Sequence, residues 1–458
     1  MQSLWLIALI SAPSSTATRS LSLEEAVARA LALEPAVAAR RVDLGRTELA
    51  LMRAELDRIS VKVDATATEL WTKSGLGADD GSGPVIGGMN PPAGAIASLN
   101  ASNQTLGLSN LSASVGLPLF AGFRLSAGIE RAEQLHEAAA SDLSSERRAT
   151  ALAVARAYWT VRKLGLVTDV ARAALERFRR ASEIAQARVD AGLAPPLDHN
   201  RARAREALAE ANVAELSGQL REAGAALAAQ LQTSEVLIPT DAATLPLLEL
   251  PPTEQLLERA ASARPELSAA SRRALAQRAA VRVAESAYYP ELALSGLFQA
   301  GNNPFLAGSG ARGVSASENP FANVRADVQL GLTLSINLFD TLHTHTAVRQ
   351  ANYELQQLDL EQRKTALRIE AEVRGAEAKI LHRRSVMDRL GPAQDLVRDN
   401  LGIIQRRYES GEALIFELLD AERELLDVER QLAETSAELR LAWLELQAAT
   451  GSIVGVEQ

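Results

Sequence analysis

The chain has 458 residues, no cysteine and a formal net charge of −9. The absence of thiols excludes disulfides, thiolate metal sites and cysteine nucleophiles. The negative charge argues against a nucleic-acid partner, because phosphate binding requires a basic surface. Only 4% of the residues are aromatic, and a composition rich in alanine is typical of long, closely packed helices.

Residues 1–17 are predicted to be a secretory signal peptide. An apolar run from Leu4 to Ile10 precedes small residues that end at Ala17, which is the order of a signal peptide and its cleavage site. The alternative is a frayed N-terminus, since no Lys or Arg precedes the apolar run. No later apolar run reaches the roughly 20 residues of a membrane helix. We therefore expect any membrane-spanning part to consist of strands.

The rest of the chain contains one structural unit twice. The segment Arg188–Gly192 recurs as Arg407–Gly411, at an offset of 219 residues. Each unit is predicted to run helix, strand, loop, strand, long helix, turn and helix. The first unit covers residues 21–232 and the second covers residues 253–451. Between them, residues 233–252 contain four prolines and are predicted to be an irregular linker, and residues 452–458 form a C-terminal tail.

Hydrophobic periodicity and turn signals place the elements along the chain. In the first unit we expect helices at about 23–57, 125–191 and 196–232, strands at about 60–72 and 105–120, and a long polar loop between the strands. In the second unit we expect a helix at about 253–287, strands at about 290–300 and 324–339, and helices at about 341–410 and 413–449. Gly391 and Pro392 are expected to bend the helix in which they lie.

Helix length predicts how these helices pack. At 1.5 Å per residue the helix at 125–191 is roughly 100 Å long, whereas the helix that follows it reaches only about 55 Å. Two short helices laid end to end would match one long helix, so we expect a tall helical column with an irregular belt halfway along it. Leucines recur every seven residues from Leu418 to Leu446, as in a coiled coil. The alternative is a helix packed on the surface of a soluble bundle.

The segment 324–339 alternates apolar and polar residues along its whole length, which predicts a strand with one apolar and one wet face. Four strands cannot close a membrane barrel, since about eight are the minimum. Left open, they would expose apolar faces and unpaired edges. We therefore expect copies of the chain to share a barrel, to which a trimer would contribute twelve strands. The rival interpretation is a soluble β-sandwich.

This order of elements resembles the TolC family of outer-membrane channel-tunnels. The strand-to-helix sequence Leu117–Arg124 (LPLFAGFR) and the two Arg-x-x-x-Gly turns support the resemblance, which covers about residues 21–451. It implies a mostly α-helical homotrimer whose twelve-stranded β-barrel contacts outer-membrane lipid in a Gram-negative bacterium. Below the barrel it implies a twelve-helix α-barrel in the periplasm. The implied partners are a periplasmic adaptor and an inner-membrane pump of the resistance-nodulation-division or ABC type.

The resemblance also implies a gate at the periplasmic end. Glu417 and Asp420 match a pair of acidic residues that forms a ring around the opening, and Asp198 and Tyr408 match residues that tie neighbouring hairpins together when the gate is closed. Ala413 stands where the family has an arginine, so the closing network differs here. Without the resemblance, Glu417 and Asp420 would be acidic residues favoured near a helix N-terminus.

The two hairpin turns are the predicted contact with the adaptor. Gly192 and Gly411 suit the left-handed backbone that ends a helix, and the resemblance adds that these glycines meet the adaptor together with Arg188 and Arg407.

The predicted function is that of a passive outer-membrane exit duct in a tripartite efflux or type I secretion system. The alternative is a periplasmic adaptor or scaffold coiled coil without a pore. We expect no enzymatic activity, cofactor or metal site, because the spacing of His343 and His345 is a weak metal signal and no nucleotide or nucleophile motif is present. Drugs, metal cations and polypeptides all remain possible cargo.

Overall fold

The computed structural model describes residues 18–72, 104–242, 249–301, 325–340 and 342–452. The predicted signal peptide 1–17 and nearly all of both strand-to-strand loops lie outside the described residues. The chain divides into two compact units, each of which contains parts of both repeats. The hairpin unit comprises residues up to 45, 137–271 and 359 onward, and the sheet unit comprises residues 46–136 and 272–358.

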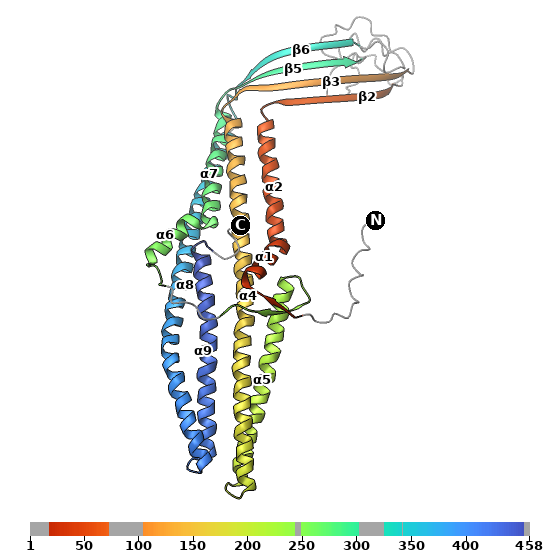
Figure 1. The fold of residues 1–458 in the computed structure, drawn as a ribbon. Coiled ribbons are helices and arrows are strands. Elements are labelled where there is room, and N and C mark those ends of the chain that lie inside the picture. Colours follow the sequence, from red (N-terminus) through yellow and green to blue (C-terminus); the bar gives the residue numbers. More distant parts are fainter. Residues whose placement is uncertain (1–17, 73–103, 243–248, 302–324, 341, 453–458) are drawn as a thin grey trace. The chain divides into compact units, whose positions relative to one another are not determined.

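The two repeats contain the same elements in the same order (Figure 1). The first consists of α1 (Leu23–Leu33), α2 (Pro35–Leu56), β2 (Ser60–Thr72), β3 (Gln104–Ala121), α4 (Arg124–Asp190) and α5 (Pro196–Gln230). The second consists of α6 (Thr253–Ala263), α7 (Pro265–Glu285), a 3₁₀ turn (Ser286–Tyr288), β5 (Glu291–Gly301), β6 (Arg325–Ser335), α8 (His343–Ser410) and α9 (Ile415–Ala449). Two short strands, β1 (Thr18–Leu21) and β4 (Val236–Pro239), complete the list. No helix among the described residues is long and apolar enough to cross a membrane.

The first helix of each repeat is broken, which corrects the single helices predicted at 23–57 and 253–287. The breaks fall at Glu34, before Pro35, and at Arg264, before Pro265, and both residues have extended backbones with ψ of 120° and 116°. A residue that precedes proline is driven out of the helical region, whereas proline itself suits the first position of a new helix. The same proline therefore ends one helix and starts the next in both repeats.

The predicted irregular linker contains a strand, which is a second correction. β4 pairs in parallel with β1, from Thr18 opposite Val236 to Leu21 opposite Pro239. Behind this pair the hydroxyl of Tyr158 donates to the Asp241 carboxylate, which also accepts the backbone N–H of Leu23 at 2.8 Å. Burial, reinforced by the hydrogen bond to Asp241, raises the pKa of Tyr158 to about 12. The N-terminal strand is thus fixed to α4 by neutral and charged hydrogen bonds together.

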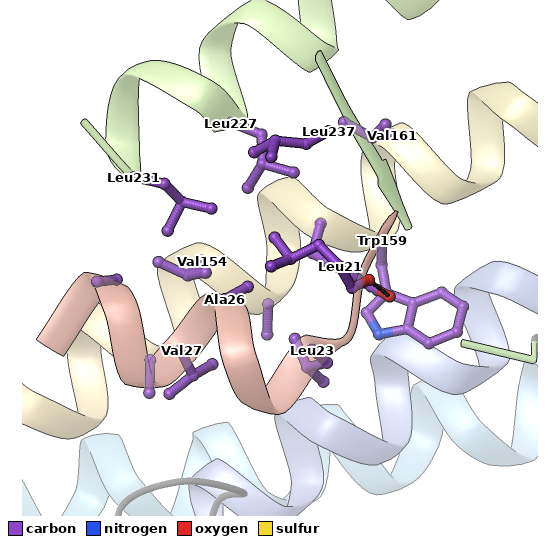
Figure 2. Packing of buried hydrophobic residues seen from close by; sticks show 14 of the residues in the cluster. Leu21, Leu23, Ala26, Val27, Val154, Trp159, Val161, Leu227, Leu231 and Leu237 are labelled. Carbon is purple, nitrogen blue, oxygen red and sulfur yellow. Dashed lines mark hydrogen bonds between the residues drawn. The ribbon is translucent and has the colours of Figure 1, made fainter. Parts of the chain in front are cut away.

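A hydrophobic core surrounds this strand pair in the hairpin unit. Figure 2 shows side chains from α1, α4, α5 and the two short strands meeting beneath the strand pair. Trp159 and Leu227 are among the largest fully buried side chains of the chain, and α9 contributes Ala437 and Leu444 to the same cluster. Full burial of a large apolar side chain contributes about 1.5–3 kcal/mol, so this core joins four helices and both short strands.

In the sheet unit the strands form one antiparallel sheet in the order β2-β3-β5-β6. The register of β3 against β5 shifts between Pro118 and Phe120, since proline has no N–H to donate to the ladder. β6 ends at Ser335 and not at residue 339 as predicted. Ser335 pairs with Glu291, the first residue of β5, so the residues after it have no ladder partner within this sheet.

The strand-to-helix corners are equivalent in the two repeats. Phe123 and Leu342, 219 residues apart, have positive φ angles of 68° and 66°, which bulky residues rarely adopt. Gly122, at φ of 55°, cannot be replaced without movement, because an added Cβ would lie 2.6 Å from the Ser286 carbonyl oxygen. These left-handed residues turn the chain sharply from β3 into α4.

The long helices are continuous. α8 has 68 residues and is assigned as helix through Pro392. In α9 the predicted heptad leucines form the packed stripe, with Leu418, Leu425 and Leu446 no more than 3% exposed. Ala421, Ala442 and Ala449 of the accompanying seam are also buried, in agreement with coiled-coil packing.

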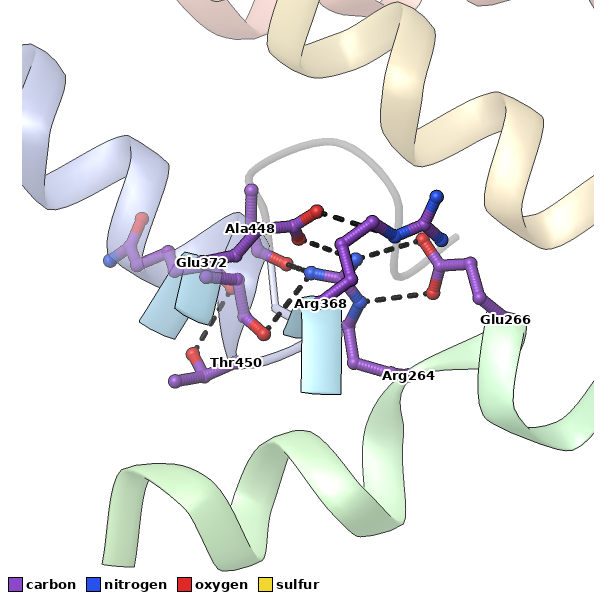
Figure 3. Close-up of polar contacts among 8 residues, drawn as sticks. Arg264, Glu266, Arg368, Glu372, Ala448 and Thr450 are labelled. Atoms are coloured by element: carbon purple, nitrogen blue, oxygen red, sulfur yellow. Dashed lines mark hydrogen bonds and ion pairs between the residues drawn. The ribbon is translucent and has the colours of Figure 1, made fainter. Parts of the chain in front are cut away.

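Arg264, at the α6–α7 break, joins three helices of the hairpin unit (Figure 3). Its guanidinium pairs with Glu266 and Glu372, each at 2.9 Å, and donates to the carbonyls of Ala448 and Ala449 at the end of α9. The residue is only 8% exposed. A cation at a helix C-terminus is favourable, so Arg264 satisfies the last turn of α9 and fixes the broken helix against α8.

We predict that Arg264→Ala lowers the free energy of unfolding by about 3–5 kcal/mol, because it leaves two carboxylates and two helix-end carbonyls without their cation. Arg368→Ala is the matched control. Arg368 is 3.8 Å from the same Glu372 but 60% exposed at its side chain, so its loss should cost at most about 1 kcal/mol. Thermal unfolding in detergent measures both, and equal losses would contradict the role given to Arg264.

Candidate gate at the hairpin tips

Both helical hairpins turn with the same cap. Gly192 and Gly411 have φ angles of 70° and 86°. In the first turn Leu193 N–H donates to Arg188 O at 2.8 Å, and in the second Glu412 N–H donates to Arg407 O at 2.7 Å. The glycine N–H groups donate to the carbonyls three residues before them. This is the Schellman motif, so both predicted glycines have a structural role in ending a helix.

The two arginines of the repeated motif have different partners. Arg188 donates to the backbone carbonyl of Tyr408 on the other hairpin, and its guanidinium carbon lies 5.0 Å from the centre of the Tyr408 ring. Arg407 reaches only Glu412 O, in its own loop, at 3.4 Å. Arg188 therefore connects the two tips, whereas Arg407 is exposed and available to another molecule.

Tyr408 is buried, with 2% of its surface exposed. Its hydroxyl has no hydrogen-bond partner among the described residues. Burial raises the pKa of Tyr408, the charge of Arg188 opposes that rise, and the charge of Asp198 adds to it. The structure thus brings Asp198, Tyr408 and Arg188 together, but the connection between hairpins passes through the arginine and not through the tyrosine hydroxyl.

The two candidate ring carboxylates lie at the start of α9. Glu417, in the first turn, is partly exposed, and Asp420 is exposed. In the described part of the chain neither lies within 4.0 Å of a cationic group. Ala413 is buried and packs in the cluster beneath the tips, so a methyl group occupies the core where the family arginine would stand.

A buried network behind the tips was not predicted from the sequence. Arg177 of α4 pairs with Glu422 at 2.8 Å and with Glu429 at 3.0 Å. Glu422 is 5% exposed, and burial raises its pKa although the charge of Arg177 opposes the rise. The seven-residue spacing of these glutamates was the available signal, since such positions lie on one face of a coiled-coil helix.

The network continues along α9 as a charge ladder, formed by Glu445, Glu438 and Glu429. Each of the three binds one base from α4 and one from α8, at distances of 2.8–3.6 Å. The pairs are Arg156 and Lys379 on Glu445, Lys163 and Arg383 on Glu438, and Arg177 and Arg398 on Glu429. Burial would raise the pKa of Glu445, but the hydrogen bonds from Lys379 and Arg156 hold it below its usual value.

No group of three His, Asp or Glu side chains able to hold a metal ion occurs in the described ranges. The candidate site is thus an arrangement of turns and charges, and the chemistry it offers is the attraction of cations and the contact between hairpins.

We predict that Gly411→Ala loosens the tips more than Gly192→Ala does. Both substitutions place a side chain at positive φ, which costs roughly 1–2 kcal/mol. Only at Gly411 would the new Cβ also meet Arg188, at 3.2 Å from Nη2, whereas nothing lies within 4 Å at Gly192. Hydrogen exchange at the end of α8 should rise more in Gly411→Ala. Equal exchange in the two variants would show that Arg188 does not depend on Gly411.

Comparisons with known proteins agree with this geometry. The profile of the outer membrane efflux protein family matches residues 39–231 and 256–452. The cobalt-zinc-cadmium resistance protein CzcC of Cupriavidus metallidurans is 28% identical over 243 residues, which are 52% of this chain and 53% of CzcC. The matched part therefore spans about half of that relative.

Solved structures match over almost the whole chain. CusC, whose crystal structures concern transmembrane channel formation, has a TM-score of 0.76 at 16% identity and covers 94% of this chain and 92% of its own. VceC of Vibrio cholerae has a TM-score of 0.73 at 19% identity, with coverages of 94% and 96%. The family predicted from the sequence is confirmed. The chain belongs to the outer membrane efflux protein family.

Proposed function

We propose that three copies of this chain form the outer-membrane exit duct of a tripartite efflux or type I secretion system. The observation that carries the proposal is the four-stranded sheet. Its two outer strands, β2 and β6, each have one edge without a partner in this sheet. On β6 the apolar residues Val328, Leu330, Leu332 and Leu334 are 64–81% exposed.

Closure by copies of the chain satisfies these groups. Unpaired backbone groups cost several kcal/mol each in lipid, and only closed barrels or helices avoid that cost. Four strands from each of three copies make a twelve-stranded barrel with the apolar face toward lipid and the polar face toward a wet lumen. The paired helical hairpins then form a twelve-helix tunnel on the periplasmic side.

A periplasmic adaptor or scaffold without a pore is the alternative. It is disfavoured because both repeats contribute a strand pair to one sheet, and because the fold matches CusC over 94% of the chain. A scaffold has no need for a sheet with one fully apolar exposed face.

The gate and the partners belong to the same proposal. Glu417 and Asp420 of three copies would form a ring of carboxylates at the periplasmic end. Arg188 with Tyr408 and Asp198 would hold the hairpins closed. Gly192, Gly411 and Arg407, with the accessible part of Arg188, would meet a periplasmic adaptor that links the duct to an inner-membrane pump.

The pump, of the resistance-nodulation-division or ABC type, supplies the energy in this proposal, and the duct conducts passively. Metal cations are favoured as cargo among drugs, cations and polypeptides, because the relative CzcC is named for cobalt, zinc and cadmium resistance. A carboxylate ring at the entrance suits cations as well.

Substitutions on β6 test the barrel. Leu332→Arg places a charge on the lipid face and should hinder assembly, at a cost of ~2–4 kcal/mol near the bilayer midplane. Thr333→Arg points to the lumen and should assemble normally. The yield of heat-resistant trimer from the outer-membrane fraction measures both. If the two variants assemble equally well, the faces are not those of a lipid-exposed barrel.

Conductance tests the gate. We expect the purified trimer in planar bilayers to show a small, cation-selective conductance that trivalent cations block from the periplasmic side, because crowded carboxylates attract cations. Glu417→Ala combined with Asp420→Ala should remove the selectivity and the block without changing trimer yield. A double variant that conducts and is blocked like the parent would identify these carboxylates as ordinary helix-start residues.

A further inference from the structure

The contact between α4 and α9 inside the chain is extensive. Trp159 of α4 and Leu444 of α9 belong to one buried cluster and are 1% and 3% exposed. Along the same contact the charge ladder joins Arg156, Lys163 and Arg177 of α4 to glutamates of α9. Because α4 is the repeat of α8 and α5 is the repeat of α9, the equivalent contact would join α8 to α5.

Within the chain the equivalent faces of α8 and α5 remain uncovered. Ala378, which corresponds to Trp159, is exposed, and so is Ala225, which corresponds to Leu444. Leu396, which corresponds to Arg177, is an apolar residue that is 66% exposed. The row of helices α8, α9, α4 and α5 therefore ends in two faces that match the two sides of an interface already formed inside the row.

We propose that α5 of one copy packs against α8 of a second copy in the register of the α4–α9 contact. The occupant is a second copy because the contact continues an established interface of the chain, with the same helix types in the same order. This inference rests on the three-copy assembly proposed above and adds which faces meet and in what register.

The seam between copies differs chemically from the seam inside the chain, because the ladder is absent from it. The positions equivalent to the three ladder glutamates are Ala226, Gln219 and Glu210 on α5, and those equivalent to the α4 bases are Gly375, His382 and Leu396 on α8. Glu210 lies 3.8 Å from Arg179 of its own hairpin. The copies thus meet through small, apolar and neutral polar side chains, while ion pairs hold the hairpins of each chain together.

Chemical cross-linking tests the register, and the natural absence of cysteine makes every introduced thiol unique. Gln219→Cys with His382→Cys, the positions equivalent to Glu438 and Lys163, should react with a short bismaleimide to give bands at the mass of two and three chains. Gln219→Cys with Arg389→Cys, one heptad away, is the mismatched control and should react poorly. Lys163→Cys with Glu438→Cys should cross-link within one chain only.

A transfer of charge tests the chemistry of the seam. Gln219→Glu with His382→Lys would rebuild across the seam the pair that Glu438 and Lys163 form inside the chain, whose atoms are 3.4 Å apart. The double variant should raise the temperature at which the trimer dissociates in detergent by about 2–4 °C, and neither single variant should. The gain should disappear in 1 M salt, where the Debye length is about 3 Å.

The outcomes separate this inference from the proposed function. A trimer that gives no cross-link between copies at 219 and 382, or a double variant that behaves like the sum of the single variants, overturns this seam and leaves the duct in place. A chain that stays monomeric in detergent overturns both.

Discussion

The length of α4 and α8 is the constraint on which the other elements depend. These helices have 67 and 68 residues, so each is roughly 100 Å long, and no other helix of the chain exceeds 35 residues. An apolar stripe of that length must be covered in segments. The proline breaks in the short helices, the strand pair that follows α5 and the glycine turns at the tips are all places where one covering segment ends and the next begins.

Duplication supplies the covering segments twice, and the two copies have since diverged in chemistry more than in backbone. The Schellman turns and the left-handed corners at Phe123 and Leu342 are repeated almost angle for angle. The side chains at equivalent positions have changed partners, as Arg188 and Arg407 demonstrate. Backbone reversals allow few solutions, whereas side-chain contacts differ because the first hairpin has different neighbours from the second.

Sequence reasoning predicted the elements that have a long period or a glycine at a required position, and missed those that depend on short or distant contacts. The long helices and strands were found within a few residues, and so was the cap at Gly192 and Gly411. The pairing of β1 with β4 joins four-residue segments more than 200 residues apart, which is too short for a periodic signal. Proline suits the first turn of a helix, so Pro35 and Pro265 did not interrupt the helical pattern although each breaks the helix before it.

The magnitudes of the ion pairs indicate what holds the two hairpins of one chain together. Arg156, Lys379 and Arg398 have side chains that are 54–62% exposed, and such pairs contribute about 0–1 kcal/mol each. Arg177 and Glu422 are 21% and 7% exposed, so their attraction is opposed by a desolvation cost of several kcal/mol per ion.

The raised pKa of Glu422 shows that desolvation exceeds the attraction at this carboxylate. This buried pair therefore fixes the register of α4 against α9 more than it stabilises the contact. Most of the stabilisation must come from apolar burial around Trp159, Leu418 and Leu425, at about 25 cal/mol for each Å² removed from water. A hairpin whose position is set by charge but whose stability comes from apolar contacts can shift along its partner only by moving a buried charge out of register, and this favours discrete positions over continuous sliding.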